Sequence, residues 1–429
     1  MYIRRVVVED VRGFSKVDFE FDEPDGSRGS WSVITGDNSS GKTSILKAIA
    51  VALVGPSTAR VLQDDFSSWI RNGETVGRVA VQMVAGPDDK FASGKRFEKA
   101  FWCEVEFEKD ERGLVNLKPG TALVGGKKGG SRGPWLEHPL GWFCVGYGPF
   151  RRLYGHSPEA QRLMSTSGKV SRFATLFRED ATLFEADGWL RELHLRRLEK
   201  NQEATLILKK VLAVLNSDVL RNGVKVLDVN SSGVMLQNPN CGDLLLKDMS
   251  DGYRSTLALV VDILRHIVDV HGDSEIALYE DGTVKVNAAG LVIVDEIDAH
   301  LHPEWQRTIG EVLKSLFPKL QFLVATHSAF VCQASSHQGI YHLPVDRRQE
   351  PYRLSEVDYQ EVIASKPNHI LTGPAFGLGQ LRSDRAVSAR RRFAELSAKQ
   401  ASLGLTRAEQ TEKGQLSLFA TTDNYEATA

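Results

Sequence analysis

The chain has 429 residues, of which 42% are hydrophobic and 25% charged, and its 53 Lys and Arg against 55 Asp and Glu leave a formal net charge of −2. This composition is typical of a globular protein with a full-sized core, and the near-neutral balance excludes a histone-like polycation or an acidic solvating tail. The four cysteines form no C-x-x-C pair, the first residues lack the apolar stretch of a signal peptide, and no segment approaches the roughly 20 apolar residues of a membrane helix. The sequence therefore predicts a soluble, cytoplasmic protein without a membrane segment.

Residues 1–157 are predicted to form a lobe of β-strands with one embedded helix. The β-rich segments, separated by polar turns, are IRRVVV, KVDFEF, WSVIT, VGRVAVQMVA, FWCEVEF and LGWFCVGYG. The segment SILKAIAVAL has apolar residues at helical spacing and follows a glycine turn. Residues 119–133 are dense in glycine and basic side chains, which is typical of a mobile loop.

Residues 158–245 change to a helical period. Leucines spaced among charges between residues 187 and 216 predict one or two amphipathic helices, too short for a sustained coiled coil. The segments VKVLDVN and GVMLQ then predict a β-hairpin. We expect this region to be a short insertion between two lobes.

Residues 246–345 are predicted to form the second lobe. It would contain a helix over STLALVVDILRHIVDVH, a hairpin, a helix near 303–316 between the strands LVIVD and FLVAT, and a short strand GIYHL. Residues 346–429 form a polar tail, with one helix predicted over 383–413 and disorder over the last dozen residues. The alternation of strands and helices indicates an α/β fold with a mixed central sheet and flanking helices.

A complete G-x-x-x-x-G-K-[ST] loop lies between a predicted strand and a predicted helix. Its two glycines would let main-chain N–H groups wrap a polyphosphate, and Lys42 would reach the β- and γ-phosphates. The hydroxyl of Thr43 would bind Mg²⁺. The predicted nucleotide-binding residues of this loop are Gly36, Asp37, Asn38, Ser39, Ser40, Gly41, Lys42, Thr43 and Ser44.

Two apolar strands are each followed by side chains that can carry chemistry. Four apolar residues precede Asp295 and Glu296, and carboxylates at the end of a buried strand are costly unless they meet a cation or a polar substrate. We predict that Asp295 holds Mg²⁺ and that Glu296 orients and deprotonates the attacking water. The next strand ends at His327, which could contact a γ-phosphate at the same edge of the sheet; a structural histidine is the alternative.

The segment MSDGYR, residues 249–254, precedes a long apolar helix. Ser250 could simply cap this helix. The alternative is a signature sequence, in which Ser250 and the backbone at Gly252 donate hydrogen bonds to the γ-phosphate held by a second subunit. Its position about forty residues before the Asp-Glu strand favours the signature.

Taken together, the glycine loop, the S-x-G segment, the apolar-Asp-Glu strand and Thr326-His327-Ser328 resemble the ABC-type ATPases of the SMC/RecF/OLD branch, which are AAA family ATPases. The resemblance covers roughly residues 1–345 and includes the opening VEDVRGFSKVDFEF and the element DEIDAHLHP. Within this branch, the segment GYGPFR at 146–151 resembles stand-alone ATPases of prokaryotic anti-phage systems, of the Septu or retron-associated type.

The resemblance implies a P-loop NTPase of the ABC-ATPase head type, with an antiparallel β subdomain, ATP and Mg²⁺ as ligands, and two copies that enclose the nucleotide. It assigns catalysis to Lys42, Glu296 and His327, the metal to Thr43 and Asp295, and the contact across the dimer to Ser250 and Gly252. It also brings Arg12 toward the nucleotide and places Asp298 in the D-loop.

Three features depart from the family pattern. The signature has Asp251-Gly252-Tyr253 where Gly-Gly-Gln is commonest. No glutamine fits the Q-loop, which leaves Tyr147 or a polar neighbour as the candidate. The insertion is short and lacks the C-x-x-C of a zinc hook, so we do not expect long-armed DNA tethering.

The sequence thus predicts an ATP-hydrolysing switch, a homodimer or higher homo-oligomer. Because the chain carries no second catalytic constellation, we expect a partner effector encoded nearby, such as a nuclease or toxin, in anti-phage defence. The alternatives are a RecF-like DNA-repair ATPase that loads on DNA itself and a sensor that binds ATP with little turnover. Nucleic acid could contact basic clusters at 127–132, 151–152, 196–197 and 390–392, although a solvated surface is the simpler interpretation.

Overall fold

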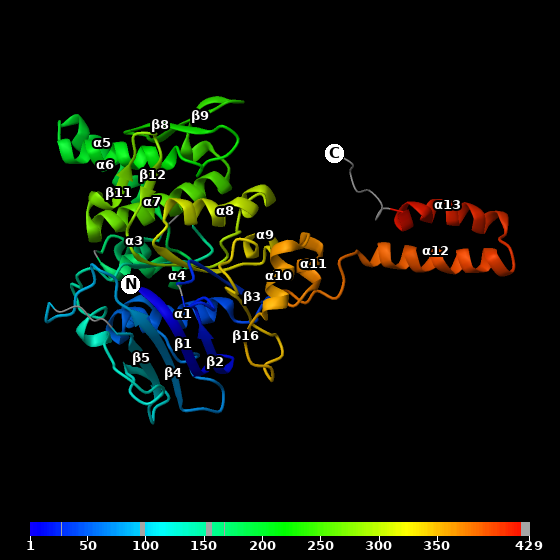
Figure 1. Cartoon of the computed structure of the whole chain (residues 1–429), viewed down its shortest axis with the longest axis horizontal. Helices are drawn as coiled ribbons and strands as arrows, with labels where there is room; N and C mark the ends of the chain where they lie inside the picture. Colours follow the sequence, from blue (N-terminus) through cyan, green and yellow to red (C-terminus); the bar gives the residue numbers. More distant parts are fainter. Residues whose placement is uncertain (27, 95–98, 152–156, 167, 422–429) are drawn as a thin grey trace.

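The computed structural model describes residues 1–26, 28–94, 99–151, 157–166 and 168–421. Arg152 of one predicted basic cluster and residues 422–429 of the segment predicted to be disordered lie outside the described residues. The chain forms one body built around two β-sheets, from which a pair of C-terminal helices projects (Figure 1).

The central sheet has six strands in the order β16-β15-β3-β14-β13-β7. These strands are β3 (Trp31–Thr35), β7 (Cys144–Tyr147), β13 (Gly290–Val294), β14 (Leu320–Ala325), β15 (Ile340–His342) and β16 (Tyr352–Arg353). All neighbours pair in parallel except β16, which is antiparallel to β15. Every residue of β3, β13 and β14 is buried, which explains their predominantly apolar sequences, because a parallel sheet is covered on both faces.

A second, antiparallel sheet has the strand order β2-β1-β4-β5-β6. Its strands are β1 (Tyr2–Val11), β2 (Phe14–Glu20), β4 (Val76–Val84), β5 (Phe101–Lys109) and β6 (Val115–Pro119). Helix α1 (Lys42–Val54) packs against strands of both sheets and is buried almost all round, as expected of a helix that is apolar on every face. A further helix, α2 (Pro56–Leu62), follows α1 and was not predicted from the sequence.

The region predicted as a helical insertion contains four helices: α3 (Pro158–Met164), α4 (Lys169–Phe177), α5 (Phe184–Leu198) and α6 (Gln202–Leu215). Helices α5 and α6 lie where one or two helices were expected. The predicted hairpin is confirmed as β8 (Lys225–Asn230) and β9 (Gly233–Asn238), and β10 (Gly242–Leu245) extends it to three strands. Of the two shorter helices, α4 packs against β7 of the central sheet.

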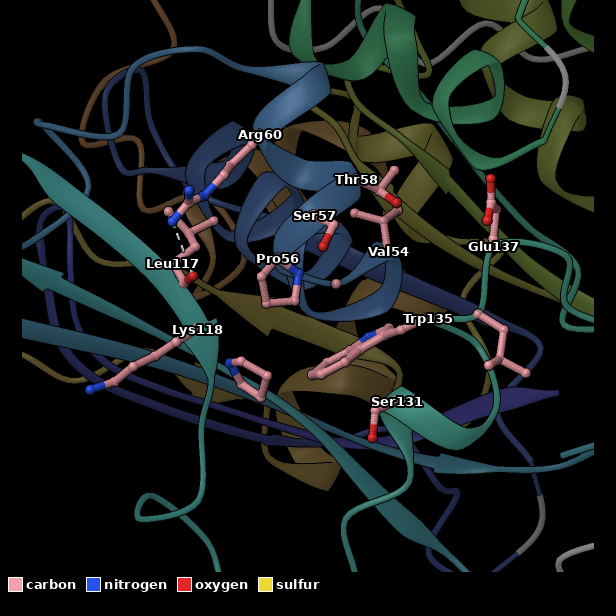
Figure 2. A pocket seen from close by; sticks show the side chains of 13 residues that line it. Val54, Pro56, Ser57, Thr58, Arg60, Leu117, Lys118, Ser131, Trp135 and Glu137 are labelled. Carbon is pink, nitrogen blue, oxygen red and sulfur yellow. Dashed lines mark hydrogen bonds between the residues drawn. The ribbon is translucent and has the colours of Figure 1, made fainter. Parts of the chain in front are cut away.

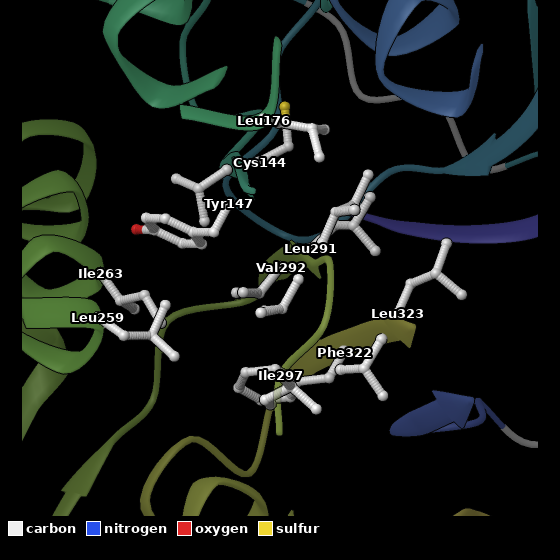
Figure 3. Packing of buried hydrophobic residues seen from close by; sticks show 14 of the residues in the cluster. Cys144, Tyr147, Leu176, Leu259, Ile263, Leu291, Val292, Ile297, Phe322 and Leu323 are labelled. Atoms are coloured by element: carbon white, nitrogen blue, oxygen red, sulfur yellow. The ribbon is translucent and has the colours of Figure 1, made fainter. Parts of the chain in front are cut away.

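The predicted elements of the second lobe are confirmed. They are the long helix α7 (Asp251–His271), the hairpin β11 (Ile276–Leu278) and β12 (Val284–Val286), and α8 (Pro303–Leu316), followed after β14 by the short α9 (Ala329–Cys332). Figure 3 shows the core at the centre of this lobe, where Leu259 and Ile263 of α7 face Val292 of β13. Within the described residues, no helix combines the length and hydrophobicity needed to cross a bilayer.

The C-terminal residues divide into two parts. Helices α10 (Glu356–Ala364) and α11 (Pro367–Thr372) pack against α9, and Leu354, Val362 and Ile370 are buried in the main core. Helices α12 (Asp384–Ser402) and α13 (Arg407–Thr421) form an antiparallel hairpin that stands away from the body (Figure 1).

The single helix predicted over 383–413 is wrong, because the chain turns between α12 and α13. Gly404 has φ +77°, a left-handed conformation that ends a helix and favours glycine. Thr406 and Glu409 then form a reciprocal capping box, since the Glu409 N–H donates to Thr406 Oγ1 (3.3 Å) and the Thr406 N–H donates to Glu409 Oε2 (2.9 Å). The sequence pattern G-x-T-x-x-E at 404–409 is typical of such a helix end followed by a new helix start.

Candidate functional site

The glycine loop follows β3 and leads directly into α1. Gly36 has φ +142° and Gly41 has φ +102°, and a Cβ on either would lie 2.5–2.6 Å from a neighbouring atom: Ser40 Oγ or the Leu343 carbonyl oxygen for Gly36, and the ring of Phe14 for Gly41. Both positions therefore require glycine. Ser39, with φ +65°, completes a loop whose backbone bends back over the N-terminus of α1.

Lys42 is buried at the centre of this loop. Its ammonium group donates to the carbonyl oxygens of Gly36 (2.9 Å) and Asp37 (3.0 Å). Burial lowers the pKa of Lys42, against the opposing effect of Asp295 and Glu296 nearby. The Ser40 hydroxyl is buried and has no hydrogen-bond partner among the described residues. An amine and a hydroxyl at the centre of a loop of this shape are suited to bind phosphate oxygens.

Thr43 and Asp295 meet at the edge of the central sheet. The Thr43 hydroxyl donates to Asp295 Oδ2 at 2.5 Å, across 252 positions of sequence. Asp295 is buried, and its Oδ1 atom has no hydrogen-bond partner in the described part of the chain. Burial raises the pKa of this carboxyl group, although Thr43, Arg151 and Lys42 counteract the shift. An orphaned carboxylate oxygen beside a threonine hydroxyl is a donor set that Mg²⁺ accepts.

Glu296 and His327 follow the neighbouring strands β13 and β14. Glu296 is half-buried and has φ +46°, an uncommon conformation for a residue other than glycine. His327 is half-buried. Its main-chain N–H donates to Asp298 Oδ1 (3.4 Å), and the same oxygen accepts a hydrogen bond from the Thr326 hydroxyl. Because β3, β14 and β13 are adjacent and parallel, both side chains lie at the same edge of the sheet as Lys42.

The predicted signature lies at the start of α7. Ser250 is exposed at the N-cap position, yet its side chain makes no capping hydrogen bond. Gly252 packs against the His300 carbonyl oxygen, which would lie 2.9 Å from an added Cβ. Tyr253 stacks edge-on against Trp305 with ring centroids 4.6 Å apart. Through Gly252 and Tyr253 the signature segment thus packs against the residues that follow Asp295 and Glu296, while Ser250 lies at the surface.

Arg12 supplies a cation close to α1. It has φ +52°, its guanidinium lies 4.7 Å from the centre of the Trp69 ring, and its buried Nε atom has no hydrogen-bond partner within the described ranges. Burial lowers the pKa of Arg12. Burial and the charge of Arg12 together lower the pKa of Lys47, one turn after Thr43 in α1. Lys47 was not among the site residues predicted from the sequence. Its position four residues after Thr43 places the two side chains on the same face of α1, and this spacing was the available signal.

Two further arginines hold the backbone of the site, and neither was predicted to do so. Arg347 donates to the carbonyl oxygens of Ser40 and Ser39 at 2.8 Å each, and its guanidinium lies 5.0 Å from the centre of the Phe14 ring. Arg151 donates to the carbonyl oxygens of Asp295 and Glu296, directly after β13. Arg151 stood in the GYGPFR segment, whereas nothing in the sequence marked Arg347.

Tyr147, one candidate for the Q-loop position, uses its hydroxyl inside the core. It is buried, and its hydroxyl donates to Asp262 Oδ2 of α7 at 2.9 Å. Figure 3 shows the ring directed toward α7 rather than along the strand.

A separate cavity of about 590 Å³ lies at the other end of α1 from the glycine loop (Figure 2). Trp135, Pro56 and Glu137 line it, and the Trp135 indole N–H donates to the Ala52 carbonyl oxygen at 2.8 Å. This cavity contains none of the predicted site residues.

Several of the basic side chains considered for nucleic-acid binding are paired within the chain. Lys128, from the loop predicted to be mobile, pairs with the buried Glu104, and Arg197 contacts Asp228 at 2.9 Å. Weaker or exposed pairs join Arg196 to Glu192, Arg391 to Glu395 and Arg392 to Glu412. Internal pairing leaves less charge for phosphates and weakens the alternative that the chain itself loads on DNA.

Two family models match the chain. Residues 5–130 match a family described as "AAA domain", and residues 159–333 match one described as "AAA domain, putative AbiEii toxin, Type IV TA system". These matches include the glycine loop and the Asp295-Glu296 strand, and they imply nucleotide binding.

Curated relatives come from two kinds of system. The chain is 22% identical over 380 residues to the Septu protein PtuA of Bacillus mycoides (strain KBAB4), an alignment that covers 88% of this chain and 45% of that protein. It is 39% identical over 101 residues to "Retron Vc95 probable ATPase" of Vibrio cholerae serotype O1 biovar El Tor, covering 24% of this chain and 18% of that protein. The chain thus spans less than half the length of these relatives.

Among solved structures, an SmcHead bound to the C-winged helix domain of ScpA aligns with a TM-score of 0.47 and 16% identity, covering 83% of this chain and 98% of that chain. The family and curated matches confirm the predicted resemblance: two segments of the chain match AAA-domain families, and the chain is similar to Septu PtuA and to retron ATPases.

Proposed function

We propose that this chain binds and hydrolyses ATP in the presence of Mg²⁺ and that two copies enclose the nucleotide. The observation that carries the proposal is the contact between Thr43 and Asp295, which leaves Asp295 Oδ1 buried beside the Lys42 ammonium and without a hydrogen-bond partner among the residues that the structure describes. A metal cation and a phosphate chain would satisfy these groups together.

Each residue then has a defined role. Lys42 exchanges the carbonyl oxygens of Gly36 and Asp37 for phosphate oxygens. Thr43 and Asp295 hold Mg²⁺, which neutralises charge on the phosphates when bound. Glu296 orients and deprotonates the attacking water, and His327 contacts the γ-phosphate from the next strand.

The dimer is supported by the surface position of the signature. Ser250 is exposed and makes no capping hydrogen bond, so its hydroxyl is available to a nucleotide held by a second copy. We propose that Ser250 and Gly252 complete the partner's site and that hydrolysis opens the interface.

The biological setting is proposed from the relatives. Homology to a Septu protein and to retron ATPases supports a role in anti-phage defence, in which the ATPase controls an effector such as a nuclease or toxin.

Lys42→Ala and Glu296→Gln test the site. We expect Lys42→Ala to lose ATP binding, measured by fluorescence with a labelled nucleotide, and Glu296→Gln to bind ATP with little turnover. Lys90→Ala, in the loop after β4, is the control and should match the wild type. Unchanged hydrolysis in both site variants would contradict the assignment.

The same Glu296→Gln protein tests the dimer. Slow hydrolysis should accumulate the ATP-bound state, so light scattering should report a doubled mass when ATP is present. Adding Ser250→Arg to the same protein should abolish this doubling. A monomer at all nucleotide and protein concentrations tested would refute the enclosed arrangement.

A further inference from the structure

Arg151 is the most completely buried arginine near the site, with 4% of its surface exposed. It lies just after β7, which pairs in parallel with β13. Its Nη1 atom donates to the carbonyl oxygens of Gly148 (2.8 Å) and Asp295 (2.8 Å). Its Nη2 atom donates to those of Glu296 (2.9 Å) and, more weakly, Ile297 (3.5 Å). Within the described residues, the hydrogen bonds of this guanidinium thus go to main-chain oxygens alone.

The turn that Arg151 holds carries the metal ligand and the proposed base. Glu296 adopts φ +46°, and an uncommon backbone conformation persists only when its surroundings hold it. On one side the Asp295 N–H donates to the Tyr147 carbonyl oxygen (2.8 Å), and on the other the Ile297 N–H donates to that of Ala325 (3.1 Å). Those two contacts fix the N–H groups of the turn, while Arg151 fixes its carbonyl oxygens.

Charge and burial fit this arrangement. The guanidinium carries a permanent positive charge, and the nearby carboxylates of Asp295, Asp298 and Glu296 offset the cost of burying it. Three successive carbonyl oxygens place their partial negative charges around this side chain. A charged donor binds them more strongly than a neutral donor would. A lysine would keep the charge but lose the planar fork that spans adjacent carbonyl groups.

We propose that Arg151 is a positioning residue for ATP hydrolysis, which sets the backbone of Asp295 and Glu296 so that the Glu296 carboxylate faces the attacking water. The inference rests on the proposed ATPase function. It assigns to Arg151 an effect on turnover, exerted through Glu296, that is separate from nucleotide binding.

The test compares Arg151→Lys with Arg353→Lys in the full chain. Arg353 is the matched control, since it also donates to main-chain oxygens, of Gln338 (2.6 Å) and Asp22 (3.1 Å), but away from the site. We expect Arg151→Lys to lower kcat by about 10- to 100-fold, as outer-shell substitutions do, with ATP affinity close to that of the wild type. Hydrogen–deuterium exchange should accelerate at residues 295–299 in Arg151→Lys only.

A double variant separates positioning from general damage. If Arg151 acts through Glu296, adding Arg151→Lys to Glu296→Gln should not lower the residual turnover further. Equal turnover and equal exchange in Arg151→Lys and Arg353→Lys would overturn the inference, as would parallel loss of ATP binding and turnover. Absence of hydrolysis by the wild type would instead refute the proposed function, and the exchange rates would still decide whether Arg151 holds the turn.

Discussion

Asp295, the proposed metal ligand, is held in the folded protein at the expense of stability. Its carboxyl group is buried, one of its oxygens has no hydrogen-bond partner among the described residues, and its pKa is raised because burial disfavours the charge. The carboxylate is therefore held in the folded protein at a free-energy cost that a bound cation would remove. Such conflicts between local stability and function are typical of active sites.

Asp295→Asn should stabilise the nucleotide-free protein and abolish its response to Mg²⁺. Removing a disfavoured charge should raise the free energy of unfolding by about 1 kcal/mol, measured by urea denaturation. Mg²⁺ with ATP should raise the melting temperature of the wild type but not of the variant. A less stable nucleotide-free variant would contradict this view of Asp295.

At this scale the sequence predicted the residues proposed to touch the ligand better than those that hold them. Lys42, Thr43 and Asp295 come together as expected, because they follow the ends of buried strands in the same parallel sheet. Arg151 and Arg347 bind main-chain oxygens, which every residue carries, so no side-chain pattern announces their partners.

Among the structural elements, the glycine loop depends on support from outside. Phe14 lies against Gly41, and Arg347 joins the carbonyl oxygens of Ser39 and Ser40 from a segment more than 300 positions later. The loop is therefore shaped by the strand β2 below it and by the chain after β15, as well as by its own glycines.

Arg347→Ala should weaken ATP binding by roughly tenfold, since two hydrogen bonds that preorganise the loop are worth about 1–3 kcal/mol together. Isothermal titration should detect the change, with the melting temperature little altered. Arg348→Ala is the control, because Arg348 is 90% exposed and pairs only with its neighbour Asp346 among the described residues. Equal affinities for the two variants would contradict a role for Arg347 in shaping the loop.

Helix α7 is joined to the central sheet by a buried polar cluster. Tyr147 donates to Asp262, which lies 3.4 Å from both Arg265 and His266. Burial alone would lower the pKa of His266, but the charge and hydrogen bonding of Asp262, together with hydrogen bonding to Asp269, outweigh it, and the pKa is raised above the ordinary 6.5. The same pairing lowers the pKa of Asp262 despite its burial.

This cluster should make stability depend on pH. A histidine with a raised folded pKa contributes stability that is complete below its unfolded pKa and is lost as pH rises through the folded value. The stability of the wild type, measured by urea unfolding, should therefore fall as the pH rises above the ordinary histidine pKa of 6.5, and that of His266→Gln should fall less. His138→Gln, at an exposed position, should behave as the wild type. Identical pH profiles of stability for all three proteins would show that the Asp262–His266 pair does not cause the pH dependence.

Helices and strands were predicted correctly where a single pattern of hydrophobic residues dominated the segment. The apolar strands β3, β13 and β14 and the long helix α7 are confirmed within a few residues. The hairpin of α12 and α13 was predicted as one helix because both halves share a helical period, and the turn rests on Gly404 and one capping box. Short helices such as α10 and α11 depend on packing against α9, which no local pattern encodes.

For the whole molecule, the C-terminal residues differ in importance. The segment from 346 to 376 contributes β16, Arg347 and core side chains such as Val362 and Ile370, whereas α12 and α13 bury little beyond Ala389 and Leu396. The two parts should therefore respond differently to truncation.

A chain ending at Arg382 should keep the melting temperature and ATP affinity of the full chain. A chain ending at Val345 should lose both, because it lacks Arg347 and exposes apolar surface on the central sheet. Thermal unfolding and nucleotide titration would check both. Loss of ATP binding in the chain ending at Arg382 would show that the projecting hairpin contributes to the site.

The order of strands in the central sheet has a consequence for synthesis of the protein. Strand β3, at residues 31–35, lies between β14 and β15, which end at residues 325 and 342. At ribosomal rates of about 5–20 residues per second, β3 waits roughly 15–60 s before its neighbours exist. During that time the unpaired main-chain edges of β3, its apolar side chains and the glycine loop are exposed on the nascent chain, so a strand that is made early is completed late. Ribosome-bound chains shorter than about 340 residues should accordingly recruit chaperones and bind no ATP.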